Sequence, residues 1–340
     1  MKRYFDNEKL TLLMLEVFKS GLYSSRYGDM VHRFEQAFAE MMGVNFAVAV
    51  NSGTSALHVA LLACGIGPGD EVIVPCLGPT MTAAAVCLTG AKPVFADIEH
   101  PGGYCMSPNS FRSGTATLQT KAIIPVHIFG NSCQMDEIVK IAQYKRHVGR
   151  DMKFYNRNPV FVIEDCAQMI KPSNSVYKLE GDIACYSFEQ SKQICCGDGG
   201  MAITNDPVLA ERMRQFSDNG AGCVTASDGR WKGPIGIDCI GHNYRMSELT
   251  AAVGLSQIDD FPEKMWAVQH RPDDADKFEK KLIDFGVTYN RKPWDKLIYQ
   301  WPIFGGHEGL CPIAESIYPN LFVFPITESK KLKKVEAYVG

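Results

Sequence analysis

The sequence lacks the features that would place it in a membrane, on nucleic acid or outside the cell. No run approaches the roughly 18 apolar residues that a membrane-spanning helix needs. The first eight residues carry no apolar signal-peptide core. The formal net charge is −3, so no basic excess indicates nucleic-acid binding. We therefore expect a cytoplasmic protein with neither a nucleic-acid nor a membrane partner.

Cysteine pairs with metal-binding or redox spacing are also missing. The chain has 12 cysteines, but none is spaced Cys-x-x-Cys, and several lie inside apolar runs. This usage is typical of reduced thiols that pack as small hydrophobic residues, so we expect no metal site. The adjacent Cys195 and Cys196 stand out because they closely follow a lysine with chemical interest, Lys192. Two small packing residues are the simpler interpretation there.

What the chain does have is alternation of apolar strand-length segments with helical segments. Hydrophobic residues make up 46% of its 340 residues, enough for a sizeable core. Continuous apolar strands between helices predict an α/β fold with a mostly parallel central sheet covered by helices. The stretch from Ser217 to Gly241 reads as a polar loop, and the pattern weakens after Pro262. We expect a large domain at residues 1–258, including a helical segment at 1–45, and a smaller C-terminal domain at 259–340.

Two segments carry a chemical signal. One apolar strand ends in Glu164-Asp165, and Lys192 follows a later strand beside a glycine-rich turn. Pyridoxal phosphate needs a lysine for its Schiff base and an acid that keeps the pyridine nitrogen protonated. Strand alternation puts Glu164 and Asp165 on opposite faces, so only one can face the ring. Gln168 could bond the ring hydroxyl, and Ser187 could donate to the phosphate.

A turn between a strand and a helix is a further candidate for anion binding. Gly53 and Thr54 lie in this turn, where backbone N–H groups of a helix N-terminus stabilise an anion. Thr54 and Ser55 could cap the helix, and capping alone is a competing interpretation. His127 ends another strand and could line the site, although a structural histidine fits the pattern equally well.

These segments resemble the DegT/DnrJ/EryC1/StrS aminotransferases, which are fold-type-I, pyridoxal-phosphate-dependent enzymes that mostly aminate keto-sugars. The matching stretches read NSGTSALHVALLACGIGPGDEVIVP, TKAIIPVHIFG, VIEDCAQ, GDIACYSFEQSKQICCGDGGMAITND and GHNYRMSELTAAVGL. The resemblance implies that Lys192 forms the Schiff base, that Asp165 pairs with the pyridine nitrogen and that Gln168 contacts the ring hydroxyl. It also assigns the cofactor phosphate to Gly53, Thr54 and Ser187.

The same resemblance implies a homodimer with shared active sites. Asn243 matches the family residue that reaches the phosphate of the neighbouring subunit, and Tyr244 and Arg245 follow it directly. We name Tyr244, Arg245 and His127 as candidates for substrate contacts. Two departures from the family stand out: Pro79 occupies the position of an aromatic that stacks on the cofactor, and the region after residue 258 is shortened.

The sequence thus predicts an aminotransferase that moves an amino group from an amino acid, glutamate or glutamine, to a keto-sugar or related cyclic ketone. Lys192 argues against the dehydratase branch of the family, which carries histidine there. Alternatives are another pyridoxal-phosphate reaction, such as decarboxylation or lysis of an amino-acid-derived substrate, and a non-catalytic homologue. A nicotinamide enzyme is disfavoured because the glycines at 65–69 follow a helix and precede a strand.

Overall fold

The computed structural model describes most of the chain. The described residues are 7–99, 103–110, 115–151, 160–171, 178–225, 231–237, 239–261, 266–271, 273–325, 331 and 333. Within them, no helix combines the length and the apolar character that crossing a membrane would require.

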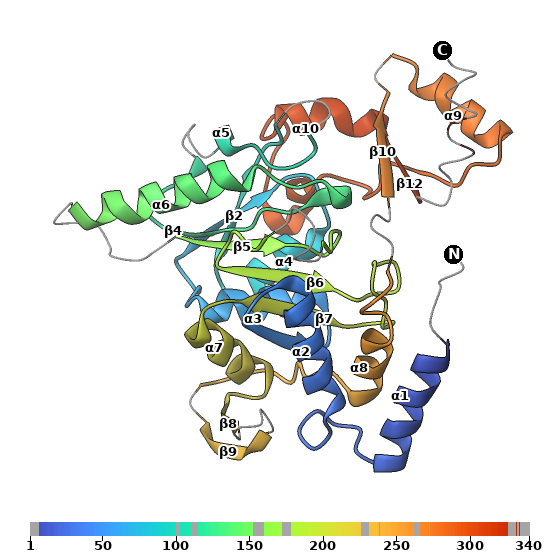
Figure 1. Ribbon diagram of the computed structural model, residues 1–340. Helices are drawn as coiled ribbons and strands as arrows, with labels where there is room; N and C mark the ends of the chain where they lie inside the picture. Colours follow the sequence, from blue (N-terminus) through green and yellow to red (C-terminus); the bar gives the residue numbers. More distant parts are fainter. Residues whose placement is uncertain are drawn as a thin grey trace.

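A seven-stranded sheet forms the centre of the molecule (Figure 1). Its strands, in spatial order, are β1 (Phe46–Val50), β7 (Gly200–Thr204), β6 (Ile183–Ser187), β5 (Phe161–Asp165), β4 (Thr120–Ile123), β2 (Glu71–Pro75) and β3 (Lys92–Ala96). The strands from β6 to β3 are parallel, whereas β7 runs antiparallel to both β6 and β1. The expected mostly parallel sheet is therefore present, with the reversed strand near one edge.

Helices cover both faces of this sheet. Those of the large unit are α1 (Asn7–Ser20), α2 (Met30–Met42), α3 (Gly53–Ala63), α4 (Thr80–Leu88), α5 (Pro108–Ser110), α6 (Met135–Asp151), α7 (Pro207–Ser217) and α8 (Glu248–Leu255). Alternate residues of β6 divide between two cores: Cys185 packs in the core with α3 and α4, and Tyr186 in the core with α2 and α8. The strand period of two therefore sets which helices cover which face.

The C-terminal region builds a small sheet and also returns to the large one. Strands β10 (Trp266–His270), β12 (Leu321–Pro325) and β11 (Asn290–Arg291) form three antiparallel strands beside α9 (Ala275–Asp284). Helix α10 (Pro312–Ile317) instead joins the large core, because Asp97 accepts hydrogen bonds from the backbone N–H groups of Ile313 and Ala314 at 2.9 and 3.0 Å. Short 3-10 turns at 298–300, 302–304 and 318–320 connect these parts. The domain boundary at 258/259 stays a prediction.

One segment differs from expectation. Within the stretch predicted as a loop, β8 (Ala221–Thr225) and β9 (Trp231–Ile237) form an antiparallel hairpin, which Figure 1 shows beneath α7. Its register is interrupted, and Pro234 lies opposite Cys223. Proline and glycine inside a strand hide the alternation that sequence reading depends on, which is why the prediction was wrong here.

Candidate active site

Asp165 lies at the carboxyl end of β5 with its side chain almost fully buried. Its Oδ2 accepts a hydrogen bond from the Thr82 hydroxyl at 2.8 Å, and its Oδ1 accepts one from the Ala167 N–H at 3.1 Å. Burial raises the pKa of Asp165, while these two hydrogen bonds and the charge of Lys192 oppose the rise. The sequence singled out Asp165 but gave Thr82 no role. Thr82 is in the first turn of α4, and its link to Asp165 spans 83 residues of sequence.

Glu164 points to the other side of the sheet, as strand alternation requires. Its Oε1 accepts the N–H groups of Glu180 and Gly181, and its Oε2 lies 3.0 Å from His127 Nε2. The Nδ1 of His127 accepts the N–H of Cys133, so Nε2 carries the proton and donates to Glu164. His127 has no exposed surface. These contacts support the structural interpretation of His127, and the substrate contact stays a prediction.

Lys192 lies in the turn after β6, half-buried, with its backbone N–H bonded to the Glu189 carbonyl at 2.9 Å. Within the described residues, its amine makes no hydrogen bond or ion pair. Burial lowers the pKa of the Lys192 amine, and the charges of Asp165 and Glu189 oppose that shift. An unpaired amine with a lowered pKa is a stronger nucleophile than a surface lysine, because more of it is neutral.

The two cysteines after Lys192 are packing residues. Cys195 is buried, its Sγ donates to the Gln190 side chain at 3.3 Å, and its backbone N–H donates to Gln257 at 3.1 Å. The Cys196 N–H donates to the Phe188 carbonyl at 2.8 Å. The cysteines whose side chains the structure describes, which do not include Cys223, are free thiols.

The predicted phosphate-binding residues meet where α3 begins. A Cβ on Gly53 would lie 2.7 Å from Ser187 Cβ, so only glycine lets the start of α3 approach the end of β6 this closely. Ser52, and not Thr54 or Ser55, caps the helix: its side chain accepts the Ser55 N–H at 3.0 Å. Capping by Ser52 leaves the Thr54 hydroxyl without a hydrogen bond in the described part of the chain. The N–H groups at this corner and two hydroxyls suit an anion.

The amide of Gln168 is oriented by one firm contact. Its Oε1 accepts the Phe129 N–H at 2.6 Å, which leaves the NH₂ group to donate elsewhere. Phe129 has a left-handed backbone (φ 56°) and stacks on Trp294 with 5.4 Å between ring centroids. Pro79 is the N-cap residue of α4 and has an extended backbone, so the position where the family has an aromatic carries no planar side chain.

The segment 243–245 runs beside the end of β1 and the end of α7. Arg245 forms a backbone bridge with Val50, and Asn243 forms one with Asp218. The Asn243 side chain is exposed and has no hydrogen bond within the described residues. Tyr244 shares a hydrogen bond of 3.1 Å with His58 Nδ1, and Arg245 forms an ion pair with Asp218. Both substrate candidates therefore have partners inside the fold, whereas Asn243 faces outward.

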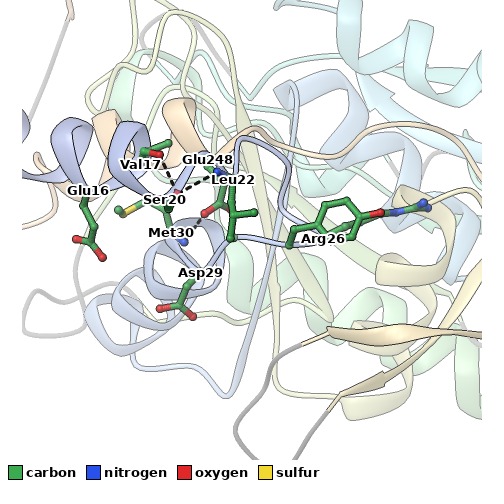
Figure 2. Close-up of a pocket in the computed structure, with 10 residues that line it drawn as sticks. Glu16, Val17, Ser20, Leu22, Arg26, Asp29, Met30 and Glu248 are labelled. Carbon is green, nitrogen blue, oxygen red and sulfur yellow. Dashed lines mark hydrogen bonds between the residues drawn. The ribbon is translucent and has the colours of Figure 1, made fainter.

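A separate pocket of about 280 Å³ lies among α1, α2 and α8 (Figure 2). Buried Glu248 accepts the N–H groups of Met30 and Val31 at 2.6 and 3.2 Å, and so caps α2 where Asp29 provides no side-chain cap. Gly28 permits this contact, because a Cβ there would lie 2.1 Å from Glu248 Oε2. None of the residues predicted for the active site lines this pocket.

Comparisons with known proteins identify the family of the chain. A family model described as the DegT/DnrJ/EryC1/StrS aminotransferase family matches residues 5–304. GDP-perosamine synthase of Escherichia coli O157:H7 is 38% identical over 287 residues, which cover 82% of this chain and 70% of that protein. GDP-perosamine synthase of Caulobacter vibrioides is 38% identical, covering 77% and 64%. The spore coat polysaccharide biosynthesis protein SpsC of Bacillus subtilis is 37% identical, covering 72% and 59%, so the chain spans less than two thirds of the latter two relatives.

Solved structures confirm the fold. The aminotransferase from Psychrobacter cryohalolentis superposes with a TM-score of 0.82 at 24% identity, covering 99% of this chain and 96% of that one. S. venezuelae DesV, solved with a ketimine intermediate, gives a TM-score of 0.78 at 25% identity, covering 98% and 94%. The predicted fold-type-I architecture and the expectation of a pyridoxal-phosphate family are both confirmed at this level. The chain belongs to the DegT/DnrJ/EryC1/StrS aminotransferase family.

Proposed function

We propose that this protein is a pyridoxal-phosphate-dependent aminotransferase that moves an amino group from glutamate or glutamine to a keto-sugar or a related cyclic ketone. The observation that carries the proposal is the Lys192 amine. It is half-buried, unpaired within the described residues, and subject to the charge of the buried Asp165 carboxylate. The relatives named GDP-perosamine synthase support the class of acceptor, because perosamine is an amino sugar.

The site fits pyridoxal phosphate on grounds of its own geometry. Strand β5 pairs with β6 so that Asp165 lies opposite Cys185, and β6 pairs with β7 so that Ser187 lies opposite Gly200. Asp165 and Ser187 therefore both lie at the carboxyl ends of neighbouring parallel strands. This end of the sheet offers a carboxylate for a pyridine nitrogen and an anion-binding corner for a phosphate. When bound, the cofactor would supply the electron sink that transamination needs.

Each site residue would then have a separate role in binding the cofactor or moving a proton. Lys192 would hold the cofactor covalently and, once released, move the proton between the substrate carbon and the cofactor. Asp165 would keep a proton on the ring nitrogen. Gln168, fixed by the Phe129 N–H, would donate its free NH₂ to the ring hydroxyl. Gly53, Thr54 and Ser187 would hold the phosphate.

Covalent trapping tests the assignment of Lys192. We expect a purified protein that is yellow and that retains the cofactor through denaturation after borohydride reduction, with the adduct on Lys192. Lys192→Ala should bind the cofactor without trapping it. An adduct on any other lysine would show that the assignment is wrong.

A half-reaction assay tests the reaction type. Glutamate or glutamine should convert the cofactor to pyridoxamine phosphate, and a panel of keto-sugars, cyclitols and keto acids should identify the acceptor that restores it. Carbon dioxide release or β-elimination without pyridoxamine phosphate would favour the decarboxylase or lyase alternative. Absence of any reaction with bound cofactor would favour a non-catalytic homologue.

We further propose a homodimer with Asn243 reaching the phosphate of the neighbouring site. Helix α1 exposes Leu12, Leu15 and Phe18 by 44–62%, an apolar face that a second copy would cover. The outward-facing Asn243 is consistent with a role across an interface. A cytoplasmic setting is part of the same proposal and agrees with the free thiols in the described part of the chain.

A further inference from the structure

The contact between Thr82 and Asp165 joins two distant parts of the fold at the predicted cofactor ring. Thr82 is 1% exposed, and its hydroxyl donates to Asp165 Oδ2 at 2.8 Å. The Ala167 N–H donates to Oδ1 at 3.1 Å, so each carboxylate oxygen has one donor. A carboxylate accepts about four hydrogen bonds, which leaves capacity for a ring N–H. With one donor on each oxygen, the carboxylate cannot rotate about its Cβ–Cγ bond without breaking one of these hydrogen bonds.

The position of Thr82 is fixed by its helix. Its neighbours Ala83, Ala85 and Val86 are fully buried in the core between α4 and the sheet. A hydroxyl in such surroundings destabilises the fold unless it is paired, and Asp165 is its side-chain partner. Valine has the same shape and would pack equally well, so packing alone does not require threonine here.

The hydroxyl also acts on the charge of Asp165. Burial raises the pKa of this carboxyl, and the hydrogen bonds from Ala167 and then Thr82 lower it again. A protonated Asp165 could not hold a positive pyridinium. A hydrogen bond to a charged group is the stronger kind, so its loss in a buried site matters for ionisation as well as for orientation.

We infer that Thr82 is a positioning residue that aims the Asp165 carboxylate at the cofactor ring. This inference rests on the proposed function, because it assigns Asp165 to the ring nitrogen. The rival explanation is that Thr82 only ties α4 to β5. The positioning role predicts that loss of the hydroxyl changes the affinity and the pH titration of the cofactor in a folded protein. The purely structural role predicts no such change.

The experiment uses the full-length protein with Thr82→Val and Thr82→Ser, and Thr82→Ala as a second hydroxyl-free variant should valine fail to fold. Pyridoxal phosphate is titrated into each apoprotein, and the pH titration of the Lys192-bound cofactor is followed by absorbance. Without the hydroxyl we expect roughly tenfold weaker cofactor binding, the effect of losing one charge-assisted hydrogen bond. A positive ring nitrogen repels a proton on the Schiff base, so weaker ring protonation should move that titration to higher pH. Thr82→Ser should titrate like the wild type.

A double-mutant comparison separates the two explanations. In an Asp165→Asn background, Thr82→Val should cause no further change in affinity or titration, because the two residues act as a unit. Hydroxyl-free variants that match the wild type in both readouts, or that lose only thermal stability, would overturn the inference. A wild-type protein that binds no pyridoxal phosphate would instead defeat the proposed function, which keeps the two failures distinct.

Discussion

At the scale of single residues, two adjacent carboxylates at the end of β5 receive opposite environments. Glu164 is fully buried among hydrogen-bond donors from three other positions, including His127. Asp165 has two donors and the nearby charge of Lys192. Glu164 thus holds the backbone in place, whereas the Asp165 carboxylate can still accept a hydrogen bond from a ligand.

Replacing each acid by its amide should separate these roles. Asp165→Asn keeps the shape but cannot hold the ring nitrogen protonated, so we expect turnover to fall roughly ten- to a hundredfold or more with the fold retained. Steady-state kinetics and circular dichroism measure both effects. Glu164→Gln is the matched control and should act mainly on stability. Near-wild-type turnover in Asp165→Asn, with activity abolished in Glu164→Gln, would mean that the wrong acid was chosen.

His58 should make stability depend on pH. Its burial, with a contribution from His242, lowers the pKa of His58 to about 4. The unfolded chain, with a histidine pKa near 6.5, then binds a proton that the folded state does not accept. Stability is therefore unaffected by His58 above about pH 6.5 and falls as the pH drops from there toward 4, by up to about 3 kcal/mol.

Urea unfolding at pH 7 and pH 4.5 measures this dependence. In His58→Gln the loss of stability between the two pH values should be smaller than in the wild type, whatever the variant loses at pH 7. His307→Gln, at an exposed position, should keep the wild-type dependence. An unchanged pH dependence in His58→Gln would contradict the shift.

At the scale of elements, the start of α3 determines the shape of the predicted phosphate corner. The helix begins at Gly53, against the end of β6, and Gly200 of β7 also lies close to this turn: a Cβ there would be 2.3 Å from the Ser52 carbonyl oxygen. Two glycines on neighbouring elements thus let a helix N-terminus sit directly over a strand end. No side chain larger than hydrogen would preserve this approach.

Gly53→Ala should therefore damage cofactor binding more than the helix itself. Its Cβ would overlap Ser187, an overpacking that costs about 1–3 kcal/mol and displaces the corner. We expect at least roughly tenfold weaker binding of pyridoxal phosphate, by fluorescence titration. Gly67→Ala is the control, because its Cβ would meet no atom nearer than 3.9 Å and its backbone does not need glycine. Equal affinities in the two variants would contradict the proposed corner.

At the scale of the whole molecule, shared active sites predict complementation between inactive subunits. Lys192→Ala should lose the covalent link, and Asn243→Ala should weaken the phosphate site of its neighbour. Mixing the two should form heterodimers in which one site has both residues intact and the other has neither, so activity should return to a fraction of the sites. Turnover of the mixture, with analytical ultracentrifugation to confirm exchange, is the measurement.

The controls are the two parent homodimers, which must both be inactive. If mixed dimers form but no activity returns, the proposal of shared active sites is wrong. If the protein is active as a monomer at working concentration, the proposal of a homodimer is wrong. A matched variant, Asn45→Ala, removes an exposed asparagine side chain away from the predicted site, while the Asn45 backbone N–H that donates to Asn205 is kept, and should stay active as its own homodimer.

Local sequence patterns predict the alternation of strands and helices and the residues proposed for the site. Apolar runs and glycine turns are local signals, so the sequence alone predicts a mostly parallel sheet covered by helices and points to Lys192, Asp165 and Ser187 as site residues. Long-range contacts show what these patterns do not: that Glu164 is hydrogen-bonded to His127, that Thr82 donates to Asp165, and that α10 returns to the large core. The pairing of β8 with β9 is also seen only in the structure. These features depend on contacts between residues far apart in the chain, and the local pattern of a sequence does not contain their register.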